Sequence, residues 1–203
     1  MSLTIASEAI AADPAFRHLS SIAGIGVDLR YATPGNFTGR DLYSPFDCAW
    51  LHREAAEALE RAVAWLARHA PGHTALVLDA LRPQRVQQQL WDALAGTDLR
   101  LYLADPARGS IHSYGMALDI TLLDAAGREL DMGTGFDDMT PLSHPALEQG
   151  FLRSGDLREA QVANRQLLRD AMHHAGFVGI RTEWWHFDCG DRDRVRQTFR
   201  RVL

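Results

Sequence analysis

Apolar residues recur at intervals of three and four along several stretches of the chain, a pattern typical of helices with one buried face. The clearest stretch is 51–69, where the pattern stops at a Pro-Gly pair that disfavours further helix. A second helix should begin near Pro83, because proline is favourable in the first turn of a helix. The same spacing predicts a third helix over 157–174 and a last one in the tail from Asp191.

Short apolar runs between these helices indicate buried strands, since turn-forming residues bound the runs. The runs cover residues 74–80, 118–123, 177–180 and 184–187. Only a few residues separate the last two, which favours an antiparallel pair over two strands joined by a helix. We therefore expect an α+β fold with a central mixed or antiparallel sheet and helices packed on it. Residues 22–45 and 133–145 are rich in turn formers and are predicted to be loops.

Composition limits the kinds of protein and partner to consider. A chain of 203 residues with 46% hydrophobic and 23% charged residues is typical of one soluble globular domain, which we expect over 1–203. Its formal net charge of -5 argues against nucleic acid as the main ligand. No apolar run approaches the roughly 20 residues that a membrane helix needs, so no membrane partner is expected.

The N-terminal segment and the cysteines bear on the compartment. The first positive side chain is Arg17, and the stretch before it has no long apolar core, unlike a secretory signal. We therefore expect a cytoplasmic protein in which Cys48 and Cys189 are free thiols. In a periplasmic protein the same two cysteines could form one disulfide.

Two segments far apart in the chain could bind one metal ion through His112, Asp119 and His186. Zinc prefers imidazole nitrogen and carboxylate oxygen, and a catalytic zinc site commonly has three protein ligands. On one regular strand, residues seven apart face opposite sides, so His112 and Asp119 could not both reach the metal. Gly115 lies between them, and we infer a turn or bulge there, because glycine adopts backbone conformations closed to other residues. Taken alone, this spacing is weak evidence for a metal site, and the two are better explained as a polar loop residue and a capping or salt-bridging group.

Glu183 and Arg82 are the candidates for catalysis. Glu183 would act as a general base beside the metal, although residues three apart, as Glu183 and His186 are, point away from each other on a regular strand. Either that segment is distorted, or Glu183 approaches from a neighbouring loop. Arg82 follows a predicted strand and could stabilise a developing oxyanion, whereas taken alone it is better explained by a salt bridge with Asp79.

Five motifs stand in order along the chain. They are Tyr31-Ala32-Thr33 with Asn36-Phe37-Thr38-Gly39, Asp79-Ala80-Leu81-Arg82-Pro83, Ser110-x-His112-x-x-Gly115-x-Ala117-x-Asp119, Asp131-Met132-Gly133-Thr134-Gly135-Phe136-Asp137 and Glu183-Trp184-Trp185-His186-Phe187. In this order they resemble the zinc D-Ala-D-Ala metallopeptidase family, and most closely its dipeptidase branch. The resemblance covers most of the chain, and five ordered matches are far more specific than the metal ligands alone.

The resemblance implies a fold and a catalytic centre. The fold would place the metal at the sheet, with one zinc ion per chain bound by His112, Asp119 and His186. Glu183 would be the catalytic base, and Arg82 would bind the carbonyl oxygen in the transition state.

The resemblance also implies the substrate and how it binds. The reaction would be hydrolysis of the dipeptide D-alanyl-D-alanine to two D-alanines, and the oligomeric state is left open. Ser110 and Asp137 would receive the free ammonium group of this small substrate, with the adjoining Asp138 as the alternative to Asp137. We expect a small pocket closed by the loops 31–45 and 132–144, which would reject long peptides.

Other functions stay open at this point. They are a D,D-carboxypeptidase or L,D-endopeptidase acting on peptidoglycan peptides, and a non-catalytic zinc-containing binding module. The presence of both Glu183 and Arg82 argues against the binding module. Either vancomycin resistance or reuse of cell-wall D-Ala-D-Ala would fit a dipeptidase.

Overall fold

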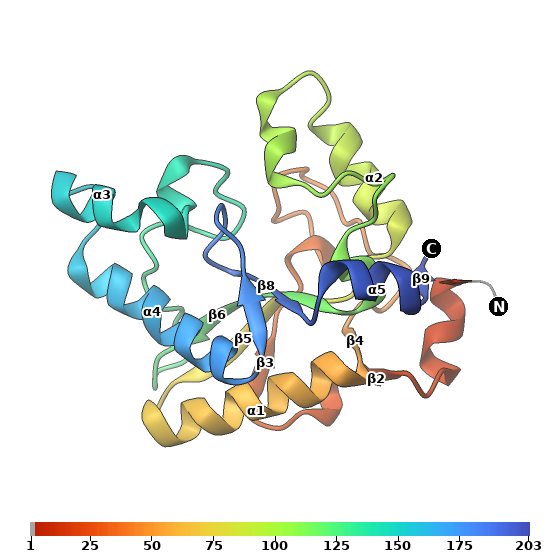
Figure 1. Ribbon diagram of the computed structural model, residues 1–203, viewed down its shortest axis with the longest axis horizontal. Coiled ribbons are helices and arrows are strands. Elements are labelled where there is room, and N and C mark those ends of the chain that lie inside the picture. The colour runs from red at the N-terminus through yellow and green to blue at the C-terminus, as the bar shows by residue number, and fades with distance from the viewer. Residues whose placement is uncertain (1–2) are drawn as a thin grey trace.

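A five-stranded sheet forms the centre of the computed structural model, which describes residues 3–203 (Figure 1). In spatial order its strands are β3 (Ile25–Val27), β5 (Thr74–Asp79), β6 (Ala117–Leu123), β8 (His186–Cys189) and β7 (Phe177–Gly179). β3 runs parallel to β5, and the other neighbouring pairs are antiparallel. The sheet is therefore mixed, and the expected α+β fold is confirmed.

Residues 3–203 contain five α-helices, two of which pack on the sheet. The five are α1 (Arg53–His69), α2 (Gln84–Ala93), α3 (Glu148–Ser154), α4 (Glu159–His174) and α5 (Arg192–Thr198). α1 and α4 lie side by side against the sheet (Figure 1), and the buried face of α1 is mostly alanine, which allows a close approach. The four predicted helices are confirmed. α3 is additional: its one buried residue is the polar Glu148, so no apolar pattern marks it.

Smaller elements complete residues 3–203. β1 (Thr4–Ile5) pairs with β9 (Arg201–Val202), and β2 (Phe16–His18) pairs with β4 (Trp50–His52). The 3-10 helices are η1 (Ser7–Ala12), η2 (Leu19–Ser21), η3 (Arg30–Ala32), η4 (Asp98–Tyr102), η5 (Ile111–Tyr114), η6 (Pro141–Ser143) and η7 (Pro145–Leu147). In this part of the chain, no helix is both long enough and apolar enough to cross a bilayer.

The structure corrects two of the predicted elements. β3 lies within 22–45, which the turn formers predict as loop. The sequence pattern misses this strand because it has only three residues, which are partly buried or exposed and form no recognisable apolar pattern. The strand predicted over 184–187 begins instead at His186. Trp184 and Trp185 are buried in an irregular segment before it, and an apolar run alone does not distinguish buried coil from buried strand.

The turn predicted at Gly115 is confirmed. Gly115 has a φ of 66° and ends η5, after which β6 begins at Ala117. A Cβ atom at this position would lie 2.7 Å from the backbone nitrogen of His52. Both the left-handed backbone and the close packing therefore require glycine. The turn places His112 before β6 and Asp119 within it, so that the two side chains can converge.

Candidate active site

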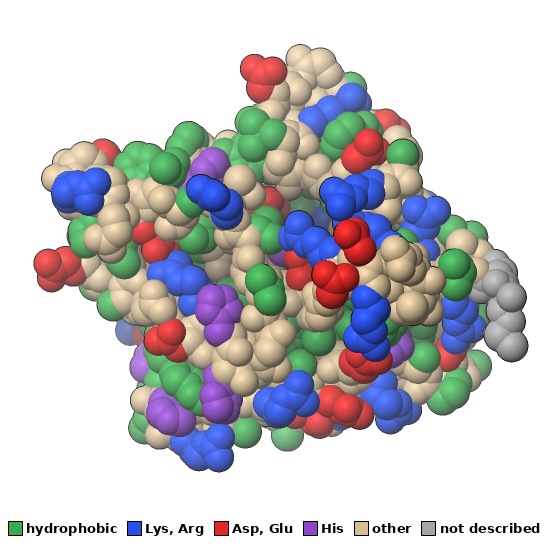
Figure 2. Space-filling view, viewed as in Figure 1, with side chains coloured by type: hydrophobic (Ala, Val, Ile, Leu, Met, Phe, Trp, Pro, Cys, Tyr) green, Lys and Arg blue, Asp and Glu red, His purple; other side chains and the backbone are tan. Residues whose placement is uncertain are grey.

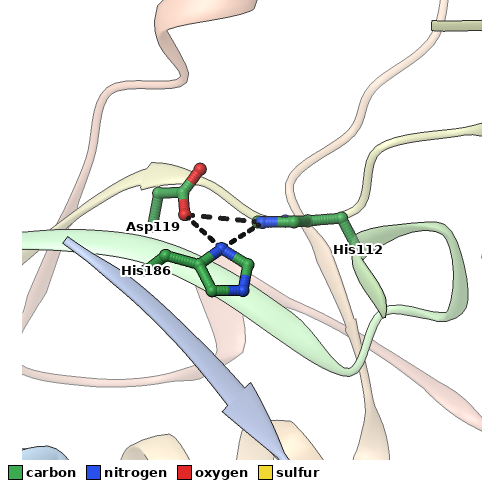
Figure 3. Close-up of side chains that lie close together, drawn as sticks. All are labelled: His112, Asp119 and His186. Atoms are coloured by element: carbon green, nitrogen blue, oxygen red, sulfur yellow. Dashed lines mark hydrogen bonds and ion pairs between the residues drawn. The ribbon is translucent and has the colours of Figure 1, made fainter. Parts of the chain in front are cut away.

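Three side chains, from His112, Asp119 and His186, converge on one point (Figure 3). β6 and β8 pair so that Asp119 lies opposite His186, and η5 brings His112 beside them. His112 Nε2 lies 3.1 Å from His186 Nδ1 and 3.4 Å from Asp119 Oδ1, and these last two atoms are 3.0 Å apart. Ligand atoms around a tetrahedral zinc ion are roughly 3.3 Å apart, given bonds of about 2.0–2.1 Å. The triangle therefore has the size of three corners of such a site.

Hydrogen bonds on the outer side of each imidazole set its protonation and orientation. His112 Nδ1 donates to the carbonyl oxygen of Ala80 at 2.8 Å, and His186 Nε2 donates to Asp188 Oδ1 at 3.0 Å. In a neutral imidazole the other nitrogen then carries a lone pair. Two lone pairs and the carboxylate oxygen of Asp119 thus face one another, a set of acceptors that a metal cation satisfies. The three residues could therefore hold a metal ion.

Charges around the triangle also favour a cation. Burial disfavours ionisation of Asp119, but His112 and His186 outweigh it and hold the pKa of the Asp119 carboxyl well below its ordinary value. Burial likewise disfavours a charged His186, yet Asp188 and Asp119 raise the pKa of this imidazole well above its usual range. Two carboxylates beside one imidazole favour positive charge, from a proton or from a metal ion.

Arg82 lies at the wall beside the triangle and is held there by polar groups. Its Nε and Nη2 donate to Asp79 Oδ2 at 2.8 and 2.5 Å, and its Nη2 also donates to Asp119 Oδ2 at 3.2 Å. Its Nη1 donates to Gln87 Oε1 at 3.2 Å, and the guanidinium packs over the Tyr31 ring, 5.1 Å from its centroid. The salt bridge with Asp79 is therefore present, and it orients Arg82 beside the site.

Glu183 lies on the loop between β7 and β8, not on a strand. This position explains how Glu183 and His186 line the same cavity although they are three positions apart. Burial raises the pKa of the Glu183 carboxyl to about 8, and the negative charges of Asp119 and Asp137 add to the shift. A carboxyl group with this pKa can take up and release a proton near neutral pH.

The three residues of the triangle line one cavity of about 260 Å³ together with Arg82 and Glu183. Figure 2 shows it as a hollow with basic side chains along one rim. Small-molecule pockets commonly measure about 300–1,000 Å³, so this one suits a very small ligand. The predicted loops 31–45 and 132–144 contribute Tyr31, Asp137 and Met139 to its wall. The buried Ser110 also lines it. Residues 101–104 form a further wall that the sequence did not predict.

Asp137, rather than Asp138, lines the cavity. It has a φ of 59°, in the left-handed region that non-glycine residues rarely adopt and that often marks functional sites. Tyr31 donates a hydrogen bond from its hydroxyl to Asp137 Oδ2 at 2.7 Å. Burial raises the pKa of the Asp137 carboxyl to about 7, against the opposing effect of this hydrogen bond. The residue is thus well placed to meet a cationic group of a ligand.

Asp188 is the main residue of this site that the sequence pattern did not single out. A signal was present, because Asp188 lies two positions after His186 and residues two apart on a strand face the same side. Tyr31 and Tyr43, which donate to Asp137 and to Asp79, carry no such signal. Tyr31 lies in the three-residue helix η3 and Tyr43 in a loop, and neither is long enough or regular enough for spacing to show where a side chain points.

Residues 16–203 match the family model described as D-ala-D-ala dipeptidase. The D-alanyl-D-alanine dipeptidase of Escherichia coli is 38% identical over 165 residues, which cover 80% of this chain and 77% of the relative. The enzyme of the same name from Enterococcus faecium is 33% identical over 192 residues, covering 84% and 88%, and that from Synechocystis is 31% identical over 196 residues, covering 80% and 76%. The chain therefore belongs to the D-Ala-D-Ala dipeptidase family of metallopeptidases.

Proposed function

We propose that this protein is a zinc-dependent dipeptidase that hydrolyses D-alanyl-D-alanine to two molecules of D-alanine. The observation that carries the proposal is a single small cavity lined by a His-Asp-His triangle, a carboxyl group of raised pKa and a buried guanidinium. Peptide hydrolysis needs these three kinds of group together: metal ligands, a base and a cation beside the carbonyl oxygen. The names of the three relatives support the choice of substrate.

His112, Asp119 and His186 would hold one zinc ion through Nε2, Oδ1 and Nδ1. A zinc ion there would supply Lewis-acid chemistry, which makes water more acidic and a carbonyl carbon more electrophilic. The carbonyl of Ala80 and the carboxylate of Asp188 accept the outer imidazole N–H groups. They thereby keep the ligand nitrogens deprotonated and pointing inward.

Glu183 would act first as general base and then as general acid. It takes a proton from the water molecule that attacks the peptide carbonyl, and it gives that proton to the amine of the departing D-alanine. Both transfers require a carboxyl group whose pKa is close to the working pH. Burial of Glu183 provides this, since it raises the pKa to about 8.

Arg82 would stabilise the negative charge that develops on the carbonyl oxygen. Its hydrogen bonds to Asp79 and Gln87 orient the guanidinium before substrate arrives, so little reorganisation is needed during the reaction. Burial opposes the charge on Arg82, but Asp79, Tyr31, Asp119 and Tyr43 together outweigh it, and the pKa of the guanidinium stays well above its usual value. The residue therefore remains a cation throughout.

Asp137 and Ser110 would bind the free ammonium group of the dipeptide. A carboxylate is the strongest natural partner for an ammonium group, and the hydroxyl of Tyr31 orients this one. Because the charged ammonium group needs a carboxylate partner, this arrangement favours substrates in which the residue before the scissile bond is the N-terminal residue. The cavity volume favours small side chains on both residues.

The direct test is release of D-alanine from D-Ala-D-Ala, with L-Ala-L-Ala as comparison, before and after treatment with a chelator. We expect hydrolysis of the D,D dipeptide only, loss of activity on chelation, and recovery when zinc is added back. If the zinc-loaded protein hydrolyses neither dipeptide, the proposal is wrong. Comparable hydrolysis of N-acylated D-Ala-D-Ala would indicate a carboxypeptidase instead.

A further inference from the structure

One hydrogen bond joins two segments at the cavity, and the proposed chemistry does not use it. Tyr102 Oη and His144 Nε2 are 2.8 Å apart, and the two rings meet edge to face with centroids separated by 5.5 Å. Tyr102 belongs to residues 98–104, here called the roof segment, and His144 ends residues 132–144, here called the substrate loop. The roof segment follows α2 in the arm that rises above the sheet, and the hollow in Figure 2 lies below this arm (Figure 1).

The substrate loop is anchored from behind by α4. Arg165 is fully buried, and it donates to the carbonyl oxygens of Met132 and Leu142 at 2.6 and 3.1 Å, near the two ends of the loop. Within the loop, Ser143 Oγ donates to the carbonyl oxygen of Asp138 at 2.7 Å. His144 therefore follows a well-supported turn and can serve as a firm partner for Tyr102.

The roof segment is held on its other side by α2. Gln87 Nε2 donates to the carbonyl oxygen of Ala104 at 2.7 Å. Between its ends the segment is open to solvent, since Leu99 and Leu101 are 38% and 62% exposed. Apolar packing therefore contributes little to its position at these residues. The bond from Tyr102 to His144 is what ties the segment to the opposite wall of the cavity.

The bridge joins the roof segment to the loop that carries the proposed partner of the substrate's ammonium group. Asp137, the proposed partner of that group, is on the same loop as His144. Tyr102 itself lines the cavity, as do Glu183 and Asp137. It is also near enough to Glu183 and Asp138 for their negative charges, together with burial, to raise the pKa of its phenol. A residue added before the dipeptide would extend beyond the ammonium site, in a small cavity whose wall includes the Tyr102 ring.

We propose that Tyr102, held in place by His144, closes the cavity beyond the ammonium site and restricts the enzyme to dipeptides. This inference rests on the proposed dipeptidase function and adds to it the pair of residues that sets peptide length. The excluded substrates are peptides that end in D-Ala-D-Ala but carry at least one more residue at their N-terminus. Tyr102 acts by occupying space, and His144 acts as its positioning residue.

Four variants separate these roles. Tyr102→Ala removes the ring, Tyr102→Phe keeps the ring without the hydrogen bond, and His144→Ala removes the partner. Leu99→Ala is the matched control, because it lies in the same roof segment but outside the cavity lining. Circular dichroism checks that each variant is folded. If Tyr102→Ala does not fold, His144→Ala and Tyr102→Phe test the same bridge.

The experiment compares D-Ala-D-Ala with the tripeptide L-Ala-D-Ala-D-Ala on the zinc-loaded protein. Release of D-alanine gives kcat/KM for each peptide. Calorimetry in the Glu183→Gln background gives the Kd of each without turnover.

For Tyr102→Ala we expect the preference for the dipeptide to fall by about tenfold or more, as for other small changes in pocket volume. For Tyr102→Phe and His144→Ala we expect a few-fold fall, in line with the loss of about one hydrogen bond. Leu99→Ala should leave the preference unchanged.

The outcomes distinguish this inference from the proposed function. If folded Tyr102→Ala and His144→Ala keep the preference of the unsubstituted protein in both turnover and binding, the roof does not set peptide length. If the unsubstituted protein releases no D-alanine from the dipeptide, the proposed function fails instead. In that case the two Kd values still decide whether Tyr102 excludes the longer peptide.

Discussion

His186 Nε2 lies 3.0 Å from Asp188 Oδ1, on the side of the imidazole that faces away from His112 and Asp119. Both residues belong to β8, where side chains two positions apart point the same way. Arg192, in the first turn of α5, donates from Nε to Asp188 Oδ2 at 2.6 Å. The position of the imidazole is thus set by a chain of contacts that reaches the C-terminal helix.

This contact predicts that Asp188 contributes to metal affinity without touching the metal. Replacing Asp188 with alanine should raise the Kd for zinc by about 10- to 100-fold, because outer partners of metal-bound histidines have effects of that size. Competition with a chromogenic chelator measures the Kd. Asp193→Ala is the control, since the Asp193 side chain is 72% exposed. Equal zinc affinity in the two variants would show that Asp188 does not orient the ligand.

Glu183 should be needed for turnover and not for metal binding. Glu183→Gln keeps the size of the side chain but removes the base, so we expect kcat to fall by about 10²- to 10⁴-fold. The zinc content should stay at one ion per chain, because Glu183 is not part of the His-Asp-His triangle. Elemental analysis and D-alanine release on the same sample check both expectations. Substantial activity in a zinc-replete variant would remove Glu183 from the mechanism.

Most of the scaffold around this site could be predicted because its helices bury one apolar face and its central strands are apolar on both faces. The spacing of apolar residues predicts α1, and a short apolar run bounded by turn formers predicts β5. The alternation of helices with closely spaced strands led to the α+β fold. The convergence of His112, Asp119 and His186 could also be predicted from the sequence. Gly115 was the local signal for a turn between His112 and Asp119. Its left-handed backbone forms that turn, which lets the two side chains converge.

Other parts of the site depend on tertiary packing that no local pattern encodes. Tyr31 and Tyr102 come from the short 3-10 helices η3 and η4, which carry no apolar pattern from which the direction of a side chain could be predicted. The start of β8 was misplaced for a related reason. Trp184 and Trp185 are buried by the surrounding elements although the backbone there is not a strand. The same irregularity is what directs Glu183 into the cavity.

Binding of the dipeptide should depend on pH through Asp137. The pKa of its carboxyl is raised to about 7, so below that pH the group is protonated and loses its attraction for an ammonium ion. Above pH of about 7.7–8.0 the α-ammonium of a peptide loses its own proton. Affinity should therefore be highest between about 7 and about 8 and fall on both sides.

Calorimetric titration of D-Ala-D-Ala into the zinc-loaded Glu183→Gln variant, from about pH 5.5 to about pH 9, measures this dependence without turnover. Adding Asp137→Asn should weaken binding at neutral pH and flatten the acidic side of the profile, while the alkaline side stays. An acidic side that persists in the double variant would mean that another group controls it.

Gly115 should be far less tolerant of alanine than other glycines of similar backbone. Gly127 provides the comparison: its φ is 75°, against 66° for Gly115, but no atom lies within 4 Å of the position of its missing Cβ. Gly127→Ala should thus lower the free energy of unfolding by about 1–2 kcal/mol, from the left-handed conformation alone.

At Gly115 the new methyl group would also meet the backbone nitrogen of His52 at 2.7 Å, and backbone atoms cannot move aside at low energetic cost. We expect Gly115→Ala to lower the free energy of unfolding by more than about 2 kcal/mol and to weaken zinc binding, because the turn at Gly115 sets the distance between His112 and Asp119. Urea denaturation of both zinc-loaded variants measures the difference, and equal losses of stability would show that the close approach to His52 imposes no cost.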